Sequence, residues 1–217
     1  MNISLDLGEL QLNKRFFIGK VLPALDGSRL GSVIDIGCGS GIYVELCRQI
    51  QEAVHPGVPM RCYHGIDQQE LRPLEERYPF FRGHQLQLCR DPLPELPEVE
   101  TVLCCEVIYY LPCWEQVVDY MLQHATVQVA FDLMYFLDHR REPVVAPLTY
   151  CKGSEHLTYL IRSLGEFERA IDRLLTKHPA ARVAHRAEWP ISPVAMQNWT
   201  GIADLQVTNG WLVIRKD

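Results

Sequence analysis

The feature that most constrains the fold is a glycine-rich turn between an apolar run and an amphipathic stretch. Residues 32–36 read Ser-Val-Ile-Asp-Ile, which is typical of a short buried parallel strand. Glycines follow at positions 37, 39 and 41, and from Ile42 apolar residues recur every three or four positions until a predicted helix end near His55. A sharp turn that leads into a helix leaves main-chain N–H groups open to a ligand.

The same alternation of strand and helix continues along the chain. Further strands are predicted at residues 62–67, 84–89, 101–105 and 126–133, and helices at 68–77 and from Trp114. Because parallel neighbours need long crossovers, this order predicts an α/β fold: a Rossmann-like, doubly wound, mostly parallel sheet with helices on both faces.

The last third of the chain has a different pattern. An amphipathic helix is predicted from an N-cap at Ser154 to Lys177, with Gly165 as a break. Strands are predicted at residues 183–189 and 210–215.

Length and charge limit the domain count and the partners. A chain of 217 residues favours a single domain over residues 1–217, and the net charge of −6 disfavours a general binder of nucleic acid or anionic membrane. The most apolar stretch, residues 125–137, is broken by Asp132 and is shorter than the ~18 residues of a membrane span. Acidic Asp6 and Glu9 stand where a secretory signal carries Lys or Arg, so a cytoplasmic location is expected.

The eight cysteines and eight histidines show no metal or redox motif. There is no C-x-x-C pair and no H-E-x-x-H sequence, so no metal site is expected. A chain of this length can bury its own core without covalent links, and the cysteines are therefore expected to be reduced, mostly buried thiols.

Two residues help to choose among the ligands that a glycine turn can bind. The third glycine of a dinucleotide fingerprint would stand where Ile42 is, and it falls one position early at Gly41. Asp35 stands two residues before the first glycine, where a carboxylate repels a pyrophosphate and attracts a cation. S-adenosylmethionine carries an ammonium and a sulfonium and has no phosphate.

The segment Asp35-Ile-Gly-Cys-Gly-Ser-Gly41 resembles the first motif of the class I S-adenosylmethionine-dependent methyltransferases. His64-Gly-Ile-Asp67 is similar to the second motif, Cys89-Arg-Asp91 to the third and residues 100–112 to the fourth. The resemblance covers about residues 30–135 in the family's order. It implies a sheet of seven strands with the last one antiparallel.

The resemblance also implies a cofactor and its contacts. The cofactor is S-adenosyl-L-methionine and the product S-adenosyl-L-homocysteine, with Asp67 on the ribose hydroxyls and Asp91 on the adenine amine. An alternative for Asp67 is that it caps the next helix, and Pro92 restricts Asp91 to extended geometry. The implied cofactor-binding residues are Asp35, Gly37, Cys38, Gly39, Gly41, Asp67, Gln68, Arg90, Asp91, Cys105 and Glu106.

The methyl acceptor is expected beyond the carboxyl ends of the fourth and fifth strands. The candidate catalytic residues are Glu106, Tyr110 and His139, and the candidate substrate-binding residues are Phe16, Tyr109, Tyr110 and Tyr135. For each tyrosine the alternative is a place in the core, and for His139 it is the solvated surface. Residues 1–30, as a helical cap, and residues 143–180, as a helical region, are further candidates for covering the acceptor.

Residues 106–111, Glu-Val-Ile-Tyr-Tyr-Leu, are similar to a segment of the nodulation N-methyltransferases, which methylate an amine. The sequence therefore predicts methyl transfer to a nitrogen or oxygen of a small molecule, by in-line displacement. One alternative is a catalytically inactive protein that binds S-adenosylmethionine and regulates a partner. Another is a nicotinamide oxidoreductase, which the position of Gly41 disfavours.

Overall fold

The protein is built on one large mixed sheet. The computed structural model describes residue 19 and residues 21–137, 142–147 and 158–217. The strands in that part of the chain are β1 (Ser32–Ile36), β2 (Cys62–Asp67), β3 (Phe81–Gln85), β4 (Val99–Cys104), β5 (Ala125–Phe136), β6 (Val144–Pro147), β7 (Thr158–Ser163), β8 (Ala181–Ile191) and β9 (Val207–Lys216).

Seven strands lie in the order β3-β2-β1-β4-β5-β9-β8, and β9 is antiparallel to both of its neighbours. This arrangement confirms the predicted Rossmann-like sheet and its antiparallel last strand. The structure adds a hairpin of β6 and β7, which pair with each other in antiparallel fashion. The described residues therefore contain nine strands where seven were predicted.

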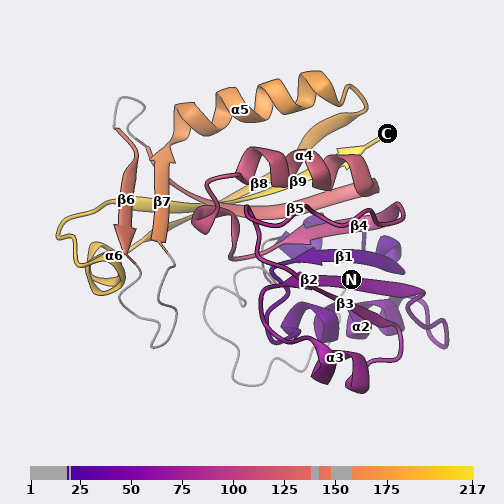
Figure 1. The fold of residues 1–217 in the computed structure, drawn as a ribbon. Helices are drawn as coiled ribbons and strands as arrows, with labels where there is room; N and C mark the ends of the chain where they lie inside the picture. The colour runs from indigo at the N-terminus through magenta and orange to yellow at the C-terminus, as the bar shows by residue number, and fades with distance from the viewer. Residues whose placement is uncertain (1–18, 20, 138–141, 148–157) are drawn as a thin grey trace.

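Helices cover both faces of the sheet (Figure 1). The helices are α2 (Ile42–Val54), α3 (Arg72–Arg77), α4 (Trp114–His124), α5 (Leu164–Lys177) and α6 (Pro193–Thr200), with short 3-10 turns η2 (Leu22–Ala24), η3 (Gly27–Arg29) and η4 (Ile108–Tyr110). Successive residues of a strand point to opposite faces. In β1, Val33 packs in the cluster with α2 and α3, and Ile34 in the cluster with α4 and α5.

A third hydrophobic cluster lies at the end of the sheet where the parallel strands finish (Figure 1). The hairpin and α6 supply much of it, with Tyr159, Ile161 and Met196 buried. Tyr109, from the segment that follows β4, and Phe136, the last residue of β5, also belong to it. This cluster lies where the sequence predicts the acceptor.

The third strand lies several residues earlier than predicted. β3 covers Phe81–Gln85, where residues 84–89 were expected. Phe81 is fully buried, and its ring stacks on Tyr63 of β2 with centroids 5.8 Å apart. The apolar residues Leu86 and Leu88, which suggested a strand, pack from the following loop against the cluster under α4.

The helix predicted from Ser154 was placed too early. Residues 158–163 form β7, in which the buried side chains alternate with half-buried ones, and α5 begins only at Leu164. Ser163 is the N-cap, and its hydroxyl accepts a hydrogen bond from the Glu166 N–H at 3.3 Å. Gly165 does not break the helix. The region 143–180 is therefore part hairpin and part helix, and Ser154 lies outside the described residues.

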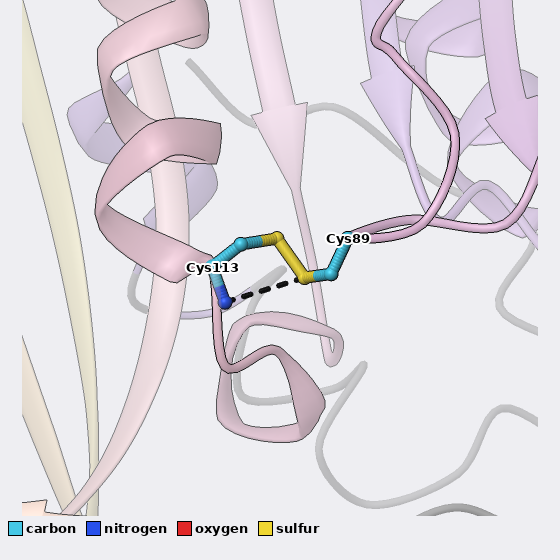
Figure 2. Close-up of a disulfide and its surroundings, with 2 residues drawn as sticks. All are labelled: Cys89 and Cys113. Atoms are coloured by element: carbon cyan, nitrogen blue, oxygen red, sulfur yellow. Dashed lines mark hydrogen bonds between the residues drawn. A yellow bond between two sulfur atoms is a disulfide. The ribbon is translucent and has the colours of Figure 1, made fainter.

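The expectation of reduced cysteines was wrong for one pair. Cys89 and Cys113 form a disulfide with a Cα–Cα distance of 5.5 Å (Figure 2). Among the described residues five cysteines are free thiols, and Cys38, Cys47, Cys104 and Cys105 of these are buried as predicted. The pairing joins the loop after β3 to the N-cap residue of α4, a contact that depends on tertiary structure.

The start of the described chain is fixed to the sheet by Gln128 of β5. Its side chain accepts a hydrogen bond from the Asp26 N–H at 2.8 Å and donates one to the Asp26 carbonyl at 3.1 Å. Most of the predicted cap at residues 1–30 lies outside the described residues, and the described remainder contains η2 and η3. No helix in the described ranges is long and apolar enough to cross a membrane.

Replacing both Cys89 and Cys113 by serine is expected to lower the free energy of unfolding. A cross-link between residues 24 apart restricts the unfolded chain and is worth about 3 kcal/mol. Urea unfolding of the wild type with and without a thiol reductant should show this loss. The Cys89→Ser/Cys113→Ser protein is the control, because its stability should not respond to the reductant. Equal stability of the wild type in both conditions would contradict the prediction.

Candidate functional site

The glycine turn after β1 forms the centre of the site. Gly37, Gly39 and Gly41 all have positive φ angles, of 76°, 52° and 80°. Gly41 is the N-cap of α2, and among the described residues no side chain caps this helix. The first N–H groups of α2 therefore remain open at the carboxyl edge of the sheet.

The space around two of these glycines differs. A Cβ atom on Gly37 would lie 2.2 Å from Cγ2 of Val107, so only glycine allows the loop after β4 to pack here. A Cβ on Gly39 would meet only the Gln69 amide nitrogen, at 3.6 Å. The loop is thus closed on one side by Val107 and more open at Gly39.

Asp67, at the end of β2, is hydrogen bonded to the glycine turn. One carboxylate oxygen accepts from the Gly39 N–H at 2.9 Å, and the other accepts from the Gln69 N–H at 3.0 Å. The capping alternative is wrong, because α3 starts five residues later, at Arg72, and its N-cap is Leu71. Asp67 joins the loops after β1 and β2 with a carboxylate at their meeting point. Gln68 is exposed, and its carbonyl accepts from the Gln85 side chain at 3.2 Å.

Asp35 is fully buried beneath the same turn. The Tyr63 hydroxyl donates to one carboxylate oxygen at 2.7 Å, and the other oxygen has no hydrogen-bond partner among the described residues. Burial raises the pKa of Asp35 to about 7, and the nearby Asp67 charge adds to this effect. The carboxyl can therefore change its charge near neutral pH.

A second polar group lies at the ends of β4 and β5. Glu106 has a left-handed φ of 65°, and its N–H donates to Asp132 Oδ1 at 2.6 Å. The Asn209 side chain donates to Asp132 Oδ2 at 3.4 Å, and the Tyr43 hydroxyl donates to Glu106 Oε1 at 3.4 Å. Burial, followed by the charge of Glu106, raises the pKa of Asp132 well above its usual value. Sequence reasoning missed Tyr43 and Asn209, and the one signal for Asp132 was an acid inside an apolar run.

The predicted adenine contacts lie in the loop held by the disulfide. Asp91 is six residues beyond the end of β3, and its carboxylate accepts from the Gln87 N–H at 2.6 Å. Arg90 is exposed and donates to the Gln87 side chain at 3.2 Å. Figure 2 shows Cys89 bonded to Cys113, whose N–H also donates to the Cys89 sulfur at 3.3 Å. Residues 87–91 therefore form a turn that the disulfide links to the start of α4.

Of the three tyrosines predicted to bind substrate, two lie together and Tyr135 lies apart from them. Tyr109 and Tyr110 form an edge-to-face pair with centroids 4.6 Å apart, and both contact the ring of Tyr159. Tyr135 belongs to the cluster under α5, where its hydroxyl bonds Glu188 at 2.9 Å. Phe16 and His139 lie outside the described residues.

The thiols near the turn are packing groups. Cys38 and Cys105 are each 3% exposed, and burial raises the pKa of both thiols above the usual value. Any contact that these residues make with a cofactor is therefore expected to use their main chain. In the described part of the chain, no three His, Cys, Asp or Glu side chains gather as a metal site requires.

Comparison with solved structures identifies the fold. A putative S-adenosylmethionine-dependent methyltransferase from Listeria monocytogenes is 13% identical, covers 91% of this chain and 96% of its own, and superposes with a TM-score of 0.58. The N-methyltransferase NodS from Bradyrhizobium japonicum WM9, in complex with S-adenosyl-L-homocysteine, is 12% identical, with 100% and 93% coverage and a TM-score of 0.57.

Magnesium protoporphyrin IX methyltransferase from Synechocystis PCC 6803, with bound SAM, is 14% identical, with 97% and 88% coverage and a TM-score of 0.53. No family model matches the sequence, and no curated protein matches it. The chain has the class I fold of the S-adenosylmethionine-dependent methyltransferases, and the N-methyltransferase NodS is among its structural neighbours.

Replacing Gly37 by alanine is expected to destabilise the protein by about 3 kcal/mol. The left-handed φ costs an alanine about 1 kcal/mol, and the contact with Val107 adds about 2 kcal/mol. Gly57→Ala is a matched control, because Gly57 has a φ of 77° and a Cβ there meets no described atom within 4 Å. It should lose about 1 kcal/mol on urea unfolding. Equal losses in the two variants would contradict the close packing of Val107.

The stability of the protein is expected to fall as pH rises from about 4 to 7, through Asp35. Its pKa is raised from 3.8 to about 7, so the folded state holds a proton that the unfolded state has already released. This difference removes up to about 4 kcal/mol over that range. Asp35→Asn keeps an acceptor for Tyr63 and should lack this loss when both proteins are unfolded in urea between pH 4 and pH 8. Parallel curves for the two proteins would show that Asp35 does not titrate in this range.

Proposed function

We propose that this protein is an S-adenosylmethionine-dependent methyltransferase that acts on a nitrogen or oxygen of a small molecule. The observation that carries the proposal is the hydrogen bond between Asp67 and the Gly39 N–H, which sets an acid against a glycine turn at the carboxyl edge of the sheet. Support comes from neighbours of the same fold that were crystallised with S-adenosylmethionine or S-adenosylhomocysteine.

The residues at this edge fit the chemical groups of S-adenosylmethionine. The open N–H groups at the start of α2 suit its carboxylate. The buried carboxyl of Asp35, with one oxygen unpartnered among the described residues, suits a nearby cation, which would favour its ionised form. Each Asp67 oxygen accepts one N–H and keeps a lone pair for a ribose hydroxyl. The adenine contact predicted for Asp91 is retained in the proposal.

When bound, S-adenosylmethionine supplies an electrophilic methyl carbon, and in-line attack by the acceptor's lone pair leaves S-adenosylhomocysteine. The protein then has to align the acceptor and exclude water. Glu106 and Tyr110 are the described candidates for contact with the acceptor and its proton. Asp132 fixes the Glu106 main chain and is a positioning residue.

A small acceptor is favoured over a nucleic acid by the net charge of −6 and by the aromatic side chains after β4. The proposal keeps one domain for residues 1–217. The cytoplasmic location expected from the sequence stays a prediction, and the Cys89–Cys113 bond counts against a strongly reducing compartment.

Asp67→Ala is expected to weaken S-adenosylmethionine binding by about 10- to 150-fold. This range corresponds to the loss of charge-assisted hydrogen bonds worth about 1.5–3 kcal/mol. Isothermal titration calorimetry measures the change directly. Asp172→Ala is the control. Asp172 is an exposed carboxylate on α5, and this helix packs with α4 and not with the glycine turn. Equal affinity in Asp67→Ala and the wild type would remove Asp67 from the cofactor site.

Turnover separates the proposal from its alternatives. The wild-type protein should convert S-adenosylmethionine to S-adenosylhomocysteine when a panel of amines, phenols and alcohols is supplied, with mass spectrometry as the readout. Binding of S-adenosylmethionine without turnover on the panel or on cell extract would favour the inactive regulatory protein. Binding of NADH in its place would favour the oxidoreductase.

A further inference from the structure

A cavity of about 350 Å³ opens between α6, β8 and the ends of β5 and β9. This volume is near the lower end of the range for small-molecule sites, about 300–1,000 Å³. Its lining includes three aromatic side chains, two aliphatic ones and one amide: Tyr109, Trp189, Trp199, Met134, Ile191 and Asn209. The cavity therefore combines apolar walls with a polar group.

Aromatic rings connect this cavity to the end of β4. Tyr109 stacks on Tyr159 with centroids 5.7 Å apart, and Tyr159 stacks on Trp199 of α6 with centroids 6.4 Å apart. Tyr110 contacts the same Tyr159 ring at 5.2 Å. The row runs from the residues that follow β4 to the helix that covers the hairpin.

Asn209 links the cavity to the carboxyl group at the strand ends. It is 3% exposed, and its amide donates to Asp132, which in turn accepts from the Glu106 N–H. The cavity wall is therefore one hydrogen bond from Asp132 and two from Glu106. A ligand in the cavity would lie beside the edge at which the proposed cofactor binds.

The charged and apolar groups around the cavity indicate which chemical class of acceptor it can bind. Its described lining contains no Lys, Arg or His side chain, and Asn209 connects it by hydrogen bonds to the Asp132 carboxyl and, through that group, to the Glu106 main chain. Among the described residues, the lining offers a phosphate or carboxylate no counter-charge, and the Glu106 carboxylate near the end of β4 would repel it. Met134, Ile191 and the ring faces offer no hydrogen bond, so hydroxyls of a polyhydroxylated acceptor that face them would stay unpaired. An ammonium is attracted by aromatic faces.

We infer that this cavity binds the methyl acceptor and that the acceptor is an amine carried on an apolar body. The inference rests on the proposed function, and it narrows the acceptor from any small molecule to this chemical class. Trp199 and Trp189 are assigned as specificity-determining residues, and Asn209 as the polar wall that faces the amine end.

Three probes of the same shape and different charge test the inference. Benzylamine, benzyl alcohol and benzoate are titrated into the full-length protein, with and without saturating S-adenosylhomocysteine, and binding is followed by ligand-observed NMR. Benzylamine should bind at least about fivefold more tightly than benzyl alcohol, and benzoate most weakly. Benzoate or benzyl alcohol binding as tightly as benzylamine would overturn the inference.

Substitutions in α6 test whether benzylamine binds in this cavity. Trp199→Leu should weaken benzylamine binding about tenfold, and Trp199→Phe should keep most of it. Val194→Ala is the matched control, because Val194 is on the same helix and is 68% exposed. Trp189→Leu on β8 is a second variant in case Trp199→Leu does not fold. Benzylamine affinity unaffected by either tryptophan substitution would overturn the inference.

Calorimetry with S-adenosylhomocysteine separates this inference from the proposed function. The wild type and both tryptophan variants should bind it equally, because Trp189 and Trp199 lie outside the glycine turn. If the cofactor binds and the probe series fails, the cavity assignment is wrong and the proposed function stands. If the wild type does not bind S-adenosylhomocysteine, the proposed function is wrong, and the probes without it still decide the charge preference of the cavity.

Discussion

The structure depends on one carboxylate placed where two parallel strands end. Asp67 accepts the Gly39 N–H and so fixes the glycine turn after β1 to the loop after β2. Together with the hydrogen bonds that the Gly37 and Cys38 N–H groups donate to the Ile66 carbonyl, at 2.7 and 3.3 Å, this bond holds a turn of three left-handed glycines. With it, the open start of α2, the buried Asp35 and the loop after β4 face one edge. Every functional group discussed above is positioned relative to that edge.

A second constraint acts on the neighbouring strands. The buried Asp132 holds the Glu106 main chain in a left-handed conformation, and Asn209 of β9 holds Asp132 from the other side. Strained backbone of this kind persists only where surrounding contacts determine it. The antiparallel strand β9 thereby contributes to the geometry after β4, although it is far away in the sequence. The same hydrogen bonds therefore fix the buried Asp132 carboxyl and the main chain that follows β4.

The sequence predicted what depends on local pattern and missed what depends on register. The glycine turn, α2 and Asp67 follow one another within 36 residues, and their order defines a βαβ start. Tyr135 was grouped with Tyr109, but neighbouring residues of a strand point to opposite faces, so Met134 joins Tyr109 and Tyr135 lies under α5. Strand β7 was read as helix because its six residues precede a strongly amphipathic helix. The Cys89–Cys113 pairing has no local signal.

The hairpin β6–β7 and α6 pack in the third cluster, which they share with residues at the ends of β5, β8 and β9 and which is distinct from the two clusters that flank the sheet. Two residue pairs join β7 to β5, while β1 and β2 pair over five. A peripheral module attached this way can change its lining side chains, its loop lengths or its helix without disturbing the glycine turn. Evolution, or a protein engineer, could therefore exchange this module to alter which molecules are recognised while the opposite end of the same edge stays as it is.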